Sequence, residues 1–483
     1  MKLNKHLFSG RVIKRLKLLL LIGLLGVSCK KMIEVPVPIT NVTTASVYSN
    51  DATAASVLTD IYANMSYLNA DLSGESLVSI TLLGALCADE LALFDTNRES
   101  LRRYYTNDLI NNTNPSFWNA IYPVIFIVNA AIEGLNNSQS LTPSVKKQLL
   151  GEAKFIRAFH YFYLTNLYGD VPLPISSNYK VNAVLSRSPQ QKLYDQIIMD
   201  LQDSQALLSE RYLAADVVTP TQERVRPTKW AATALLSRVY LYTKNFKKAE
   251  EEATKIIDHT SLYSLVSLNE VFLKNSSEAI WQLQSVGLFE GSNTGEGAIF
   301  ILPEGGPNTN YNPVYLNPDL VKIYEAGDQR RASWIDSVNV DGQIYYYPFK
   351  YKIGRVNTPT MEYPMVLRLA EQYLIRAEAR LQQNNLVAGT SDLNIIRRRA
   401  KLPDLTFSGI TDLLEFTMQE RRRELFTEWG HRWLDLKRTQ TVDAIMTHST
   451  AQKGGDWKSS AQLFPLPLSD LLADPNLIQN PGY

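Results

Sequence analysis

Apolar residues recur along most of this chain at the three- and four-residue spacing of one helix face. In "GEAKFIRAFHYFYLTNLYGDVPLP", residues 151–174, six aromatic rings fall between Phe155 and Tyr168. On a helical wheel, the apolar positions cover most of the circumference, which is typical of a helix packed between other helices. Gly169 and Pro172 then predict the end of this helix. We therefore assign these rings to the core and not to a ligand-binding surface.

The same spacing predicts a series of helices at 51–67, 116–135, 144–168, 189–209, 228–243, 246–259, 366–383, 387–400 and 411–438. Asp51 is expected to cap the first helix, and Pro123 to kink the second. The helices at 228–243 and 246–259 carry small and aromatic residues at tetratricopeptide spacing, and a weaker echo pairs Ala377 with Leu381. The pattern predicts a mainly α fold built from helical hairpins and identifies no ligand.

The segments between these helices have a different composition. Residues 260–365 are rich in Gly, Asn, Pro and Tyr, and residues 68–115 are similarly irregular. Within the first segment, "EAIWQLQ" and "QIYYYPFKYK" predict short strands, with Trp281 in the core. Long irregular segments in compact proteins are usually functional. We therefore expect a helical scaffold at 116–260 and 366–440, a loop-rich ligand-binding lobe at 68–115 and 260–365, and an extended C-terminal segment at 461–483.

The N-terminus predicts an export signal over residues 1–28. Basic residues precede the apolar stretch "LLLLIGLLGV" at 18–27, which is too short for a stable membrane-spanning helix. Cys29 then follows at the expected cleavage point, as in bacterial lipoprotein signals, whose cysteine is acylated. We expect lipidation of Cys29 and a lipidated tether at 29–44 that holds the protein on a membrane. Ordinary secretion with a coincidental cysteine is the alternative.

Composition argues against several classes of function. Lys and Arg number 49 against 48 Asp and Glu, so the basic field of a nucleic-acid binder is missing. The arginine runs at 397–399 and 421–423 lie among carboxylates and are expected to form internal ion pairs. Two cysteines permit no disulfide framework, and Cys87 is expected to be a small buried hydrophobe. The five histidines are scattered, so we expect no metal and no cofactor.

Five stretches, in order, resemble motifs of the SusD/RagB family of outer-membrane nutrient-binding lipoproteins from Bacteroidota. They are residues 151–174, "RPTKWAATALLSRVYLYTKNFKKA", "VLRLAEQYLIRAEARL" followed by "DLNIIRRRAKL", "ERRRELFTEWGHRWLDLKR" and "LFPLPLSDLLADPNLIQNPGY". The resemblance implies about four tetratricopeptide-like helix pairs with a loop-rich lobe and a few short strands. It also implies that Arg157, Arg432 and Asp435 are scaffold residues rather than catalytic ones.

The function implied by this resemblance is non-catalytic capture of a nutrient at the outer membrane. An oligosaccharide is the first expectation and a peptide the second, since the loops hold few Trp residues for sugar stacking. The nutrient would pass to a SusC-like TonB-dependent transporter, and the lipid anchor would hold the chain on the cell surface.

Glycan capture needs exposed aromatic rings together with planar hydrogen-bonding side chains. The irregular segments, where the family's ligand contacts lie, offer such residues in three places. The candidate ligand-binding residues are Asp89, Glu90, Phe94, Asn97, Arg98, Phe289, Asn308, Asn310, Tyr311 and Tyr315.

Two other functions compete with capture. A glycoside hydrolase needs two carboxylates that flank one bond, and the attractive local pair is Asp89 and Glu90. Neighbouring residues on a regular element point apart, and no hydrolase motif accompanies them, so we expect no enzyme. The third possibility is a repeat scaffold that binds only protein partners.

Overall fold

The computed structural model describes residues 44–66, 79–113, 116–286, 293–356, 358–406 and 409–483. The chain separates into two units, residues 1–47 and 48–483. The first unit contributes α2 (Thr44–Val47) to the described residues, and everything that follows concerns the second unit. The predicted signal, the tether up to residue 43, Cys29 and Phe289 lie outside the described residues.

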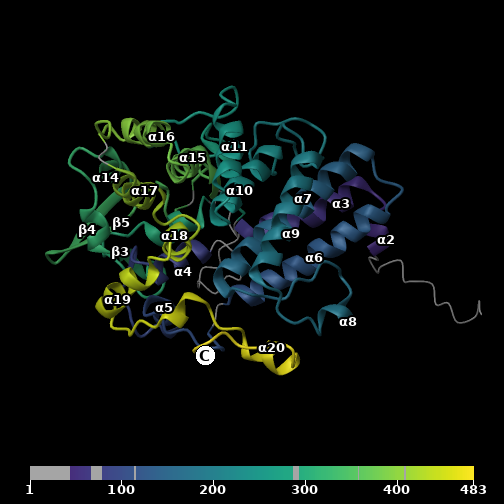
Figure 1. The fold of residues 1–483 in the computed structure, drawn as a ribbon, viewed down its shortest axis with the longest axis horizontal. Helices are drawn as coiled ribbons and strands as arrows, with labels where there is room; N and C mark the ends of the chain where they lie inside the picture. Colours follow the sequence, from purple (N-terminus) through teal and green to yellow (C-terminus); the bar gives the residue numbers. More distant parts are fainter. Residues whose placement is uncertain (1–43, 67–78, 114–115, 287–292, 357, 407–408) are drawn as a thin grey trace, which may run out of the picture. The chain divides into compact units, whose positions relative to one another are not determined.

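Helices in consecutive pairs form the larger part of the fold (Figure 1). They are α3 (Asp51–Ser66), α6 (Phe117–Asn137), α7 (Pro143–Tyr168), α9 (Gln190–Leu207), α10 (Lys229–Tyr242), α11 (Phe246–Ile257), α15 (Leu369–Gln382) and α16 (Leu386–Arg399). Along this series α6 packs on α7, α7 on α9, α9 on α10, α10 on α11, α11 on α15 and α15 on α16. The predicted mainly α scaffold of helical hairpins is therefore confirmed.

Helix α7 lies in the core, as its sequence predicts. All six rings between Phe155 and Tyr168 are buried. Phe155 and Phe159 meet Trp281 edge to face, with ring centroids 5.0 and 5.5 Å apart. The helix ends at Gly169, whose φ of +75° lies in the left-handed region that favours glycine. The aromatic stretch therefore serves folding, because its rings are closed to any ligand.

Small residues let α15 and α16 approach closely. A Cβ added at Gly389 would lie 2.6 Å from the Leu381 side chain, closer than real Cβ contacts allow. Ala377 and Leu381 are fully buried in the cluster that these helices share. The weaker tetratricopeptide echo in the sequence thus marks a second closely packed helix pair.

The strands form three separate two-stranded antiparallel sheets among the described residues. They pair β1 (Leu91–Leu93) with β3 (Val314–Leu316), β2 (Ala279–Gln282) with β6 (Met365–Arg368), and β4 (Ile335–Val340) with β5 (Gln343–Pro348). The strands predicted in "EAIWQLQ" and "QIYYYPFKYK" are β2 and β5. In Figure 1, β3, β4 and β5 lie together on the left, and α3, α6, α7 and α9 lie on the right.

Short helices occupy much of the material between these elements. They are α4 (Ser79–Cys87), α5 (Glu99–Tyr105), α8 (Tyr179–Asn182), α12 (Gly295–Phe300), α13 (Pro318–Lys322), α14 (Gln329–Trp334), α19 (Val442–Gln452), the 3-10 helix η2 (Ser459–Gln462) and α20 (Leu468–Ala473). Residues 79–105 are therefore more regular than their composition predicts. The C-terminal segment is extended apart from η2 and α20. Cys87 is buried, as expected.

The helix predicted at 411–438 is wrong as a single element, because the chain breaks it into α17 (Ile410–Leu425) and α18 (His431–Arg438). Thr427, Trp429 and Gly430 between them have positive φ. A Cβ added at Gly84 of α4 would lie 3.0 Å from the Gly430 Cα, so the break is where α4 closely approaches the chain. The break also turns Trp429 into the core, where its Nε1 donates to the Met365 carbonyl at 2.7 Å.

A second correction concerns the start of α3. Asn50, and not Asp51, caps this helix, since its Oδ1 accepts a hydrogen bond from the Ala52 backbone N–H at 2.9 Å. Asp51 instead accepts a hydrogen bond from the backbone N–H of Thr142 at 2.9 Å. The Asp51 carboxylate thus joins α3 to the turn before α7.

The arginine runs form internal ion pairs, as predicted. Arg399 pairs with Glu278 and Glu424, and Arg421 with Asp435 at 2.7 Å. The motif residues Arg157 and Arg432 pair in the same way with Asp200 and Asp89, both at 2.7 Å. All of these carboxylates are buried. The motif arginines and Asp435 are therefore scaffold residues that hold elements together.

Candidate functional site

Two turns that are far apart in the sequence lie side by side at the end of one small sheet. Residues 94–98 follow β1, residues 308–313 precede β3, and these strands pair antiparallel. The Phe94 backbone N–H continues the pairing by donating to the Pro313 carbonyl at 2.8 Å. Arg98 Nη1 donates to the Thr309 carbonyl at 2.9 Å. The structure thus brings together the two regions that sequence analysis selected for ligand contact.

The turn at 308–313 is shaped by two asparagines. Asn308 Oδ1 accepts hydrogen bonds from the backbone N–H groups of Asn310 and Tyr311, at 3.2 and 2.8 Å. The buried Asn312 donates through Nδ2 to the carbonyls of Ile299 and Ile301, at 2.9 and 3.0 Å. These bonds fix the turn against α12 and leave Asn310 and Tyr311 exposed.

Four aromatic rings and one guanidinium gather at these turns. Phe94 is 44% exposed and Tyr311 is 50% exposed, whereas Tyr315 and Tyr345 are half-buried. Tyr345 meets Phe94 and Tyr315 edge to face, with centroids 6.2 and 5.1 Å apart. The Arg355 Cζ lies 4.6 Å from the centroid of the Tyr311 ring. We call Phe94, Tyr311, Tyr315, Tyr345 and Arg355 the aromatic surface.

Sequence analysis missed two members of this surface, Tyr345 and Arg355. Tyr345 lies in "QIYYYPFKYK", where the alternation of a strand puts successive tyrosines on opposite faces. The run of tyrosines was therefore a usable signal. Arg355 lies in a loop after β5, and no local pattern distinguishes it from other exposed arginines.

Asp89 and Glu90 lie in the interior, away from the surface that a ligand could reach. Burial alone would raise the pKa of Asp89, but Arg432 and Arg422 hold it well below its usual range. Glu90 turns to the Thr427 backbone N–H at 3.3 Å, and burial, assisted by Asp89, raises its pKa to about 7. Because of these contacts, Asp89 and Glu90 stabilise the interior of the fold and are not accessible to a ligand.

The other described candidates lie together at the two turns. Asn97 is exposed, and its backbone N–H donates to Asp95 Oδ1 at 2.9 Å. Arg98 is half-buried and joins the two turns. The structure therefore groups seven of the ten candidates, namely Phe94, Asn97, Arg98, Asn308, Asn310, Tyr311 and Tyr315.

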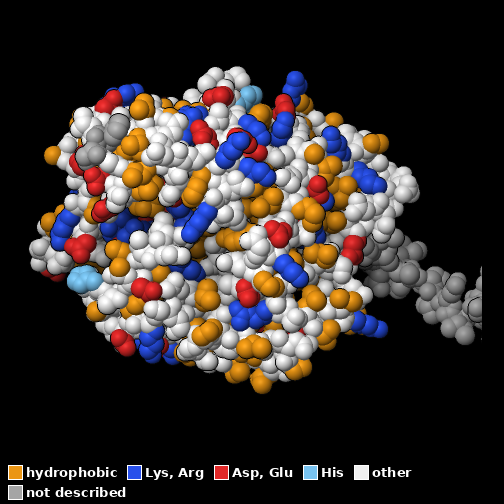
Figure 2. Space-filling model, in the orientation of Figure 1, with side chains coloured by type: hydrophobic (Ala, Val, Ile, Leu, Met, Phe, Trp, Pro, Cys, Tyr) orange, Lys and Arg blue, Asp and Glu red, His pale blue; other side chains and the backbone are white. Residues whose placement is uncertain are grey.

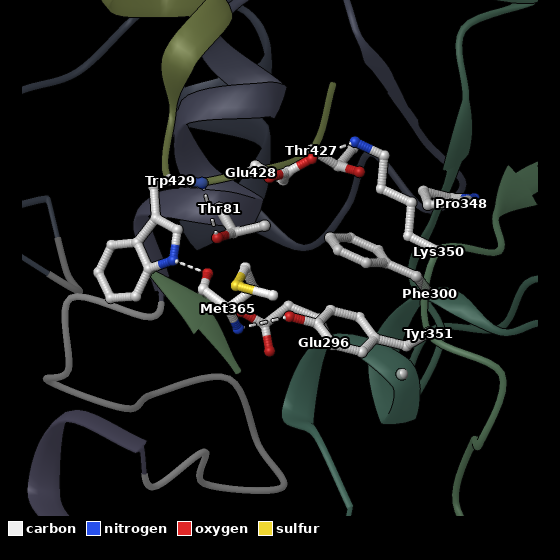
Figure 3. A pocket seen from close by; sticks show the side chains of 11 residues that line it. Thr81, Glu296, Phe300, Pro348, Lys350, Tyr351, Met365, Thr427, Glu428 and Trp429 are labelled. Atoms are coloured by element: carbon white, nitrogen blue, oxygen red, sulfur yellow. Dashed lines mark hydrogen bonds and ion pairs between the residues drawn. The ribbon is translucent and has the colours of Figure 1, made fainter. Parts of the chain in front are cut away.

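A small cavity lined by both polar and apolar side chains lies between α12, the end of β5 and the break before α18 (Figure 3). Burial raises the pKa of Glu296 to about 7 and lowers the pKa of Lys350 to about 8. Such perturbed groups would mark a catalytic site if the cavity admitted a substrate. Its volume is about 10 Å³, which is room for one water molecule. A sugar cannot enter, so we assign these groups to the scaffold, where Lys350 pairs with Glu428.

A wider apolar groove of about 400 Å³ lies between α6, α8 and α20. Its walls include Trp118, Tyr122 and Phe126 of α6 and Tyr179 of α8. Figure 2 shows hydrophobic side chains gathered over the position of α20, where Leu472 is highly exposed. Helix α6 is long and apolar enough to cross a membrane, but it buries one face against α7. The groove offers few polar groups to a sugar, so its chemistry suits a protein contact better.

Comparison with known families agrees with the fold. A family model described as "Starch-binding associating with outer membrane" matches residues 44–241, and one described as "SusD family" matches residues 336–483. The chain belongs to the SusD family. The two matches together span more than half of the chain and include the helical scaffold on both sides of the loop-rich lobe.

Relatives and solved structures of this family cover nearly the whole chain. SusD-like protein P2 of Formosa agariphila is 26% identical, and the alignment covers 96% of this chain and 98% of that protein. A SusD superfamily protein from Bacteroides vulgatus superposes with a TM-score of 0.77 at 19% identity, over 90% of this chain and 100% of the other. A laminarin-binding SusD-like protein superposes with a TM-score of 0.71 at 20% identity, over 90% and 99%. The tetratricopeptide-like helical fold of the SusD family is thereby confirmed for this chain.

Proposed function

We propose that this SusD-family protein captures an oligosaccharide on the aromatic surface, without altering it, and delivers it to a SusC-like TonB-dependent transporter at the outer membrane. The observation that carries the proposal is that Phe94 and Tyr311, both exposed, lie on the two turns that adjoin at the end of the β1–β3 sheet. Exposed aromatic rings flanked by planar polar groups are the chemistry that sugar rings need.

The proposed ligand contacts combine stacking and hydrogen bonding. Phe94, Tyr311, Tyr315 and Tyr345 offer ring surface, and the exposed amides of Asn97 and Asn310 with the Arg98 guanidinium offer hydrogen bonds. Asn308 positions the turn, because its side chain is occupied by backbone N–H groups. Asp89 and Glu90 are not part of this proposal, since both are buried.

Capture without catalysis fits the carboxylates of the surface. Hydrolysis of a glycosidic bond needs two carboxyl groups about 5 to 9.5 Å apart across the bond. Asp95 lies at this edge, and its two oxygens accept hydrogen bonds from the Asn97 N–H and the Thr309 hydroxyl. A carboxylate fixed in this way supports the turn and is poorly placed to act as nucleophile or acid.

Attachment and delivery rest on the family and on the sequence. The family description places its members at the outer membrane, and Cys29 follows a lipoprotein-like signal. We infer that acyl chains on Cys29 anchor the protein, with the folded part facing the cell surface. The apolar groove of α6, α8 and α20 is available for a protein contact. A peptide as the captured nutrient, and a scaffold that binds only protein, are the competing functions.

The test is calorimetric titration of residues 30–483, which include every described residue, with pools of oligosaccharides and of peptides. We expect an oligosaccharide to bind and Tyr311→Ala to weaken binding by about 10- to 100-fold, the equivalent of one large apolar contact. Tyr179→Ala is the matched control, because Tyr179 is also an exposed tyrosine, at 69%, but lies on α8. Binding of peptides alone, or turnover of a bound glycan, contradicts the proposal.

A further inference from the structure

The aromatic surface carries a positive charge that no carboxylate of the described residues neutralises through an ion pair. Arg355 is exposed, and its guanidinium lies against the Tyr311 ring. The exposed Arg398, by contrast, is paired with Asp404. The free charge therefore lies at the ring that the proposed function uses for sugar stacking.

The acidic side chain at this edge is already engaged. Asp95 accepts hydrogen bonds from the Asn97 N–H and from Thr309 Oγ1, at 2.9 and 3.0 Å. The Asn97 backbone N–H is the largest cause that lowers the pKa of Asp95, so this carboxylate stays ionised and fixed in its turn. The Arg98 guanidinium also contributes to lowering the pKa of Asp95. Asp95 thus compensates Arg98, and the Arg355 charge remains.

The loop that carries Arg355 is held in place before any ligand arrives. The buried Glu362 carboxylate accepts hydrogen bonds from the backbone N–H groups of Lys352 and Ile353, at 2.6 and 3.2 Å. The Ile353 carbonyl oxygen approaches Gly297 of α12 so closely that a Cβ added at Gly297 would lie 2.3 Å from it. Helix α12 and its C-terminal end therefore support the Arg355 loop and, through Asn312, the Tyr311 turn. Helix α12 therefore positions both the Tyr311 turn and the Arg355 loop.

We propose that the captured glycan is acidic, and that Arg355 binds its carboxylate or sulfate group while a neighbouring sugar packs on Tyr311. The proposal rests on the proposed function and adds the substrate class. A guanidinium presents two parallel N–H donors that match the oxygens of a carboxylate or sulfate. Hydrogen bonds to a charged acceptor are about twice as strong as those to a neutral hydroxyl, so an acidic glycan gains most from this residue.

The experiment compares three probes of equal length by calorimetry at low salt: an oligogalacturonate, its carboxyl-reduced neutral counterpart and a sulfated galactan oligosaccharide. We expect at least one acidic probe to bind tenfold or more tightly than the neutral one. Arg355→Gln should remove this preference, a loss of about 10- to 100-fold for the acidic probe, and Arg355→Lys should restore part of it. Arg211→Gln is the matched control, since it removes an exposed arginine outside the aromatic surface.

The outcomes separate this inference from the proposed function. Preference for the uronate or for the sulfate supports the inference and identifies the acidic group. Equal binding of acidic and neutral probes, unchanged by Arg355→Gln but abolished by Tyr311→Ala, overturns the inference and leaves glycan capture standing. If none of the three probes binds, the inference of an acidic ligand is overturned, and glycan capture is decided separately by the titration with oligosaccharide pools. Thermal unfolding of each variant verifies that the exposed substitutions leave the fold intact.

Discussion

Arg368 is the residue whose replacement should test the electrostatic core most directly. Its guanidinium donates to both oxygens of Glu428 at 2.7 and 2.9 Å, to Glu424 at 2.7 Å and to Glu278 at 3.0 Å. A further bond reaches the Glu424 carbonyl at 2.9 Å. The side chain lies where β6 passes into α15, so it connects the small β2–β6 sheet with the end of α17.

Arg368→Met keeps an unbranched apolar stem and removes the guanidinium, so the loss combines the buried ion pairs with the space that the guanidinium fills. Lys350, Arg330 and Arg399 remain, each already bound to carboxylates of the same cluster. The buried Glu428 carboxylate loses the residue that donates two hydrogen bonds to it. Breaking a buried ion pair from one side costs about 3 to 5 kcal/mol, and we expect the free energy of unfolding to fall by that amount at pH 7.

The pH dependence of this loss follows from the pKa of Glu428. Burial alone would raise that pKa, but Arg368 and Lys350 together lower it. A carboxyl whose folded pKa is lowered stabilises the fold above its unfolded pKa and loses that contribution as the pH falls. Without Arg368, burial has a larger net effect on Glu428, and the pKa of this carboxyl rises. Protonation of Glu428 at lower pH then removes the buried charge. The difference between wild type and variant should therefore narrow between pH 7 and pH 5.

Urea unfolding followed by circular dichroism, at both pH values, measures these differences. Arg398→Gln serves as the control, because Arg398 pairs with Asp404 at the exposed surface and should leave the midpoint nearly unchanged. Two results would refute the reasoning. One is a loss of unfolding free energy below about 1 kcal/mol for Arg368→Met at pH 7, and the other is a difference between wild type and variant that is larger at pH 5 than at pH 7.

Three further predictions follow from single positions. Gly297→Ala places a Cβ against the Ile353 carbonyl and should lower the free energy of unfolding by about 1 to 3 kcal/mol, measured in urea, and weaken glycan binding as the Arg355 loop shifts. Burial raises the pKa of Glu296 to about 7, so the contribution of this carboxyl to stability should decline from pH 4.5 to 7, and in thermal melts Glu296→Gln should be more stable than the wild type at pH 8 but not at pH 5. Burial raises the pKa of the Cys87 thiol to about 12, so a thiol reagent at pH 8 should label it only after denaturation, as absorbance at the reagent's wavelength reports.

The helical scaffold could be predicted because each long helix carries its own period. Helix α7 shows this, since its buried rings follow the wheel drawn from its sequence. The break between α17 and α18 could not be read in the same way, because the apolar period continues across it. Its cause lies far away in the chain, in the close approach of Gly84 to Gly430 and the hydrogen bond from Trp429 to Met365. Local patterns do not record contacts of that kind.

The candidate surface was predicted in part for a similar reason. Tyr311 lies in the glycine- and asparagine-rich stretch "EGGPNTNYNP", and Phe94 directly precedes the polar residues "DTNR", so both contrasts are visible in the sequence. Asp89 and Glu90 share the same neighbourhood but end in the interior, because Arg432 and the Thr427 N–H approach them from a motif more than 300 residues away. The apolar run that follows them, "LAL", was a signal of burial that could have separated them from the exposed candidates.

The helical scaffold and the aromatic surface have different roles in a capture protein. The scaffold places its charged motif residues inside ion clusters, where a substitution such as Arg368→Met acts on stability. The aromatic surface is built from turns that rest on α12 and on the β1–β3 pair, so Tyr311 and Arg355 can change without disturbing that core. Turn residues of this kind can vary between relatives while the scaffold stays the same. Specificity for a nutrient would then reside in a few exposed side chains, which is why the charge of Arg355 bears on the class of glycan.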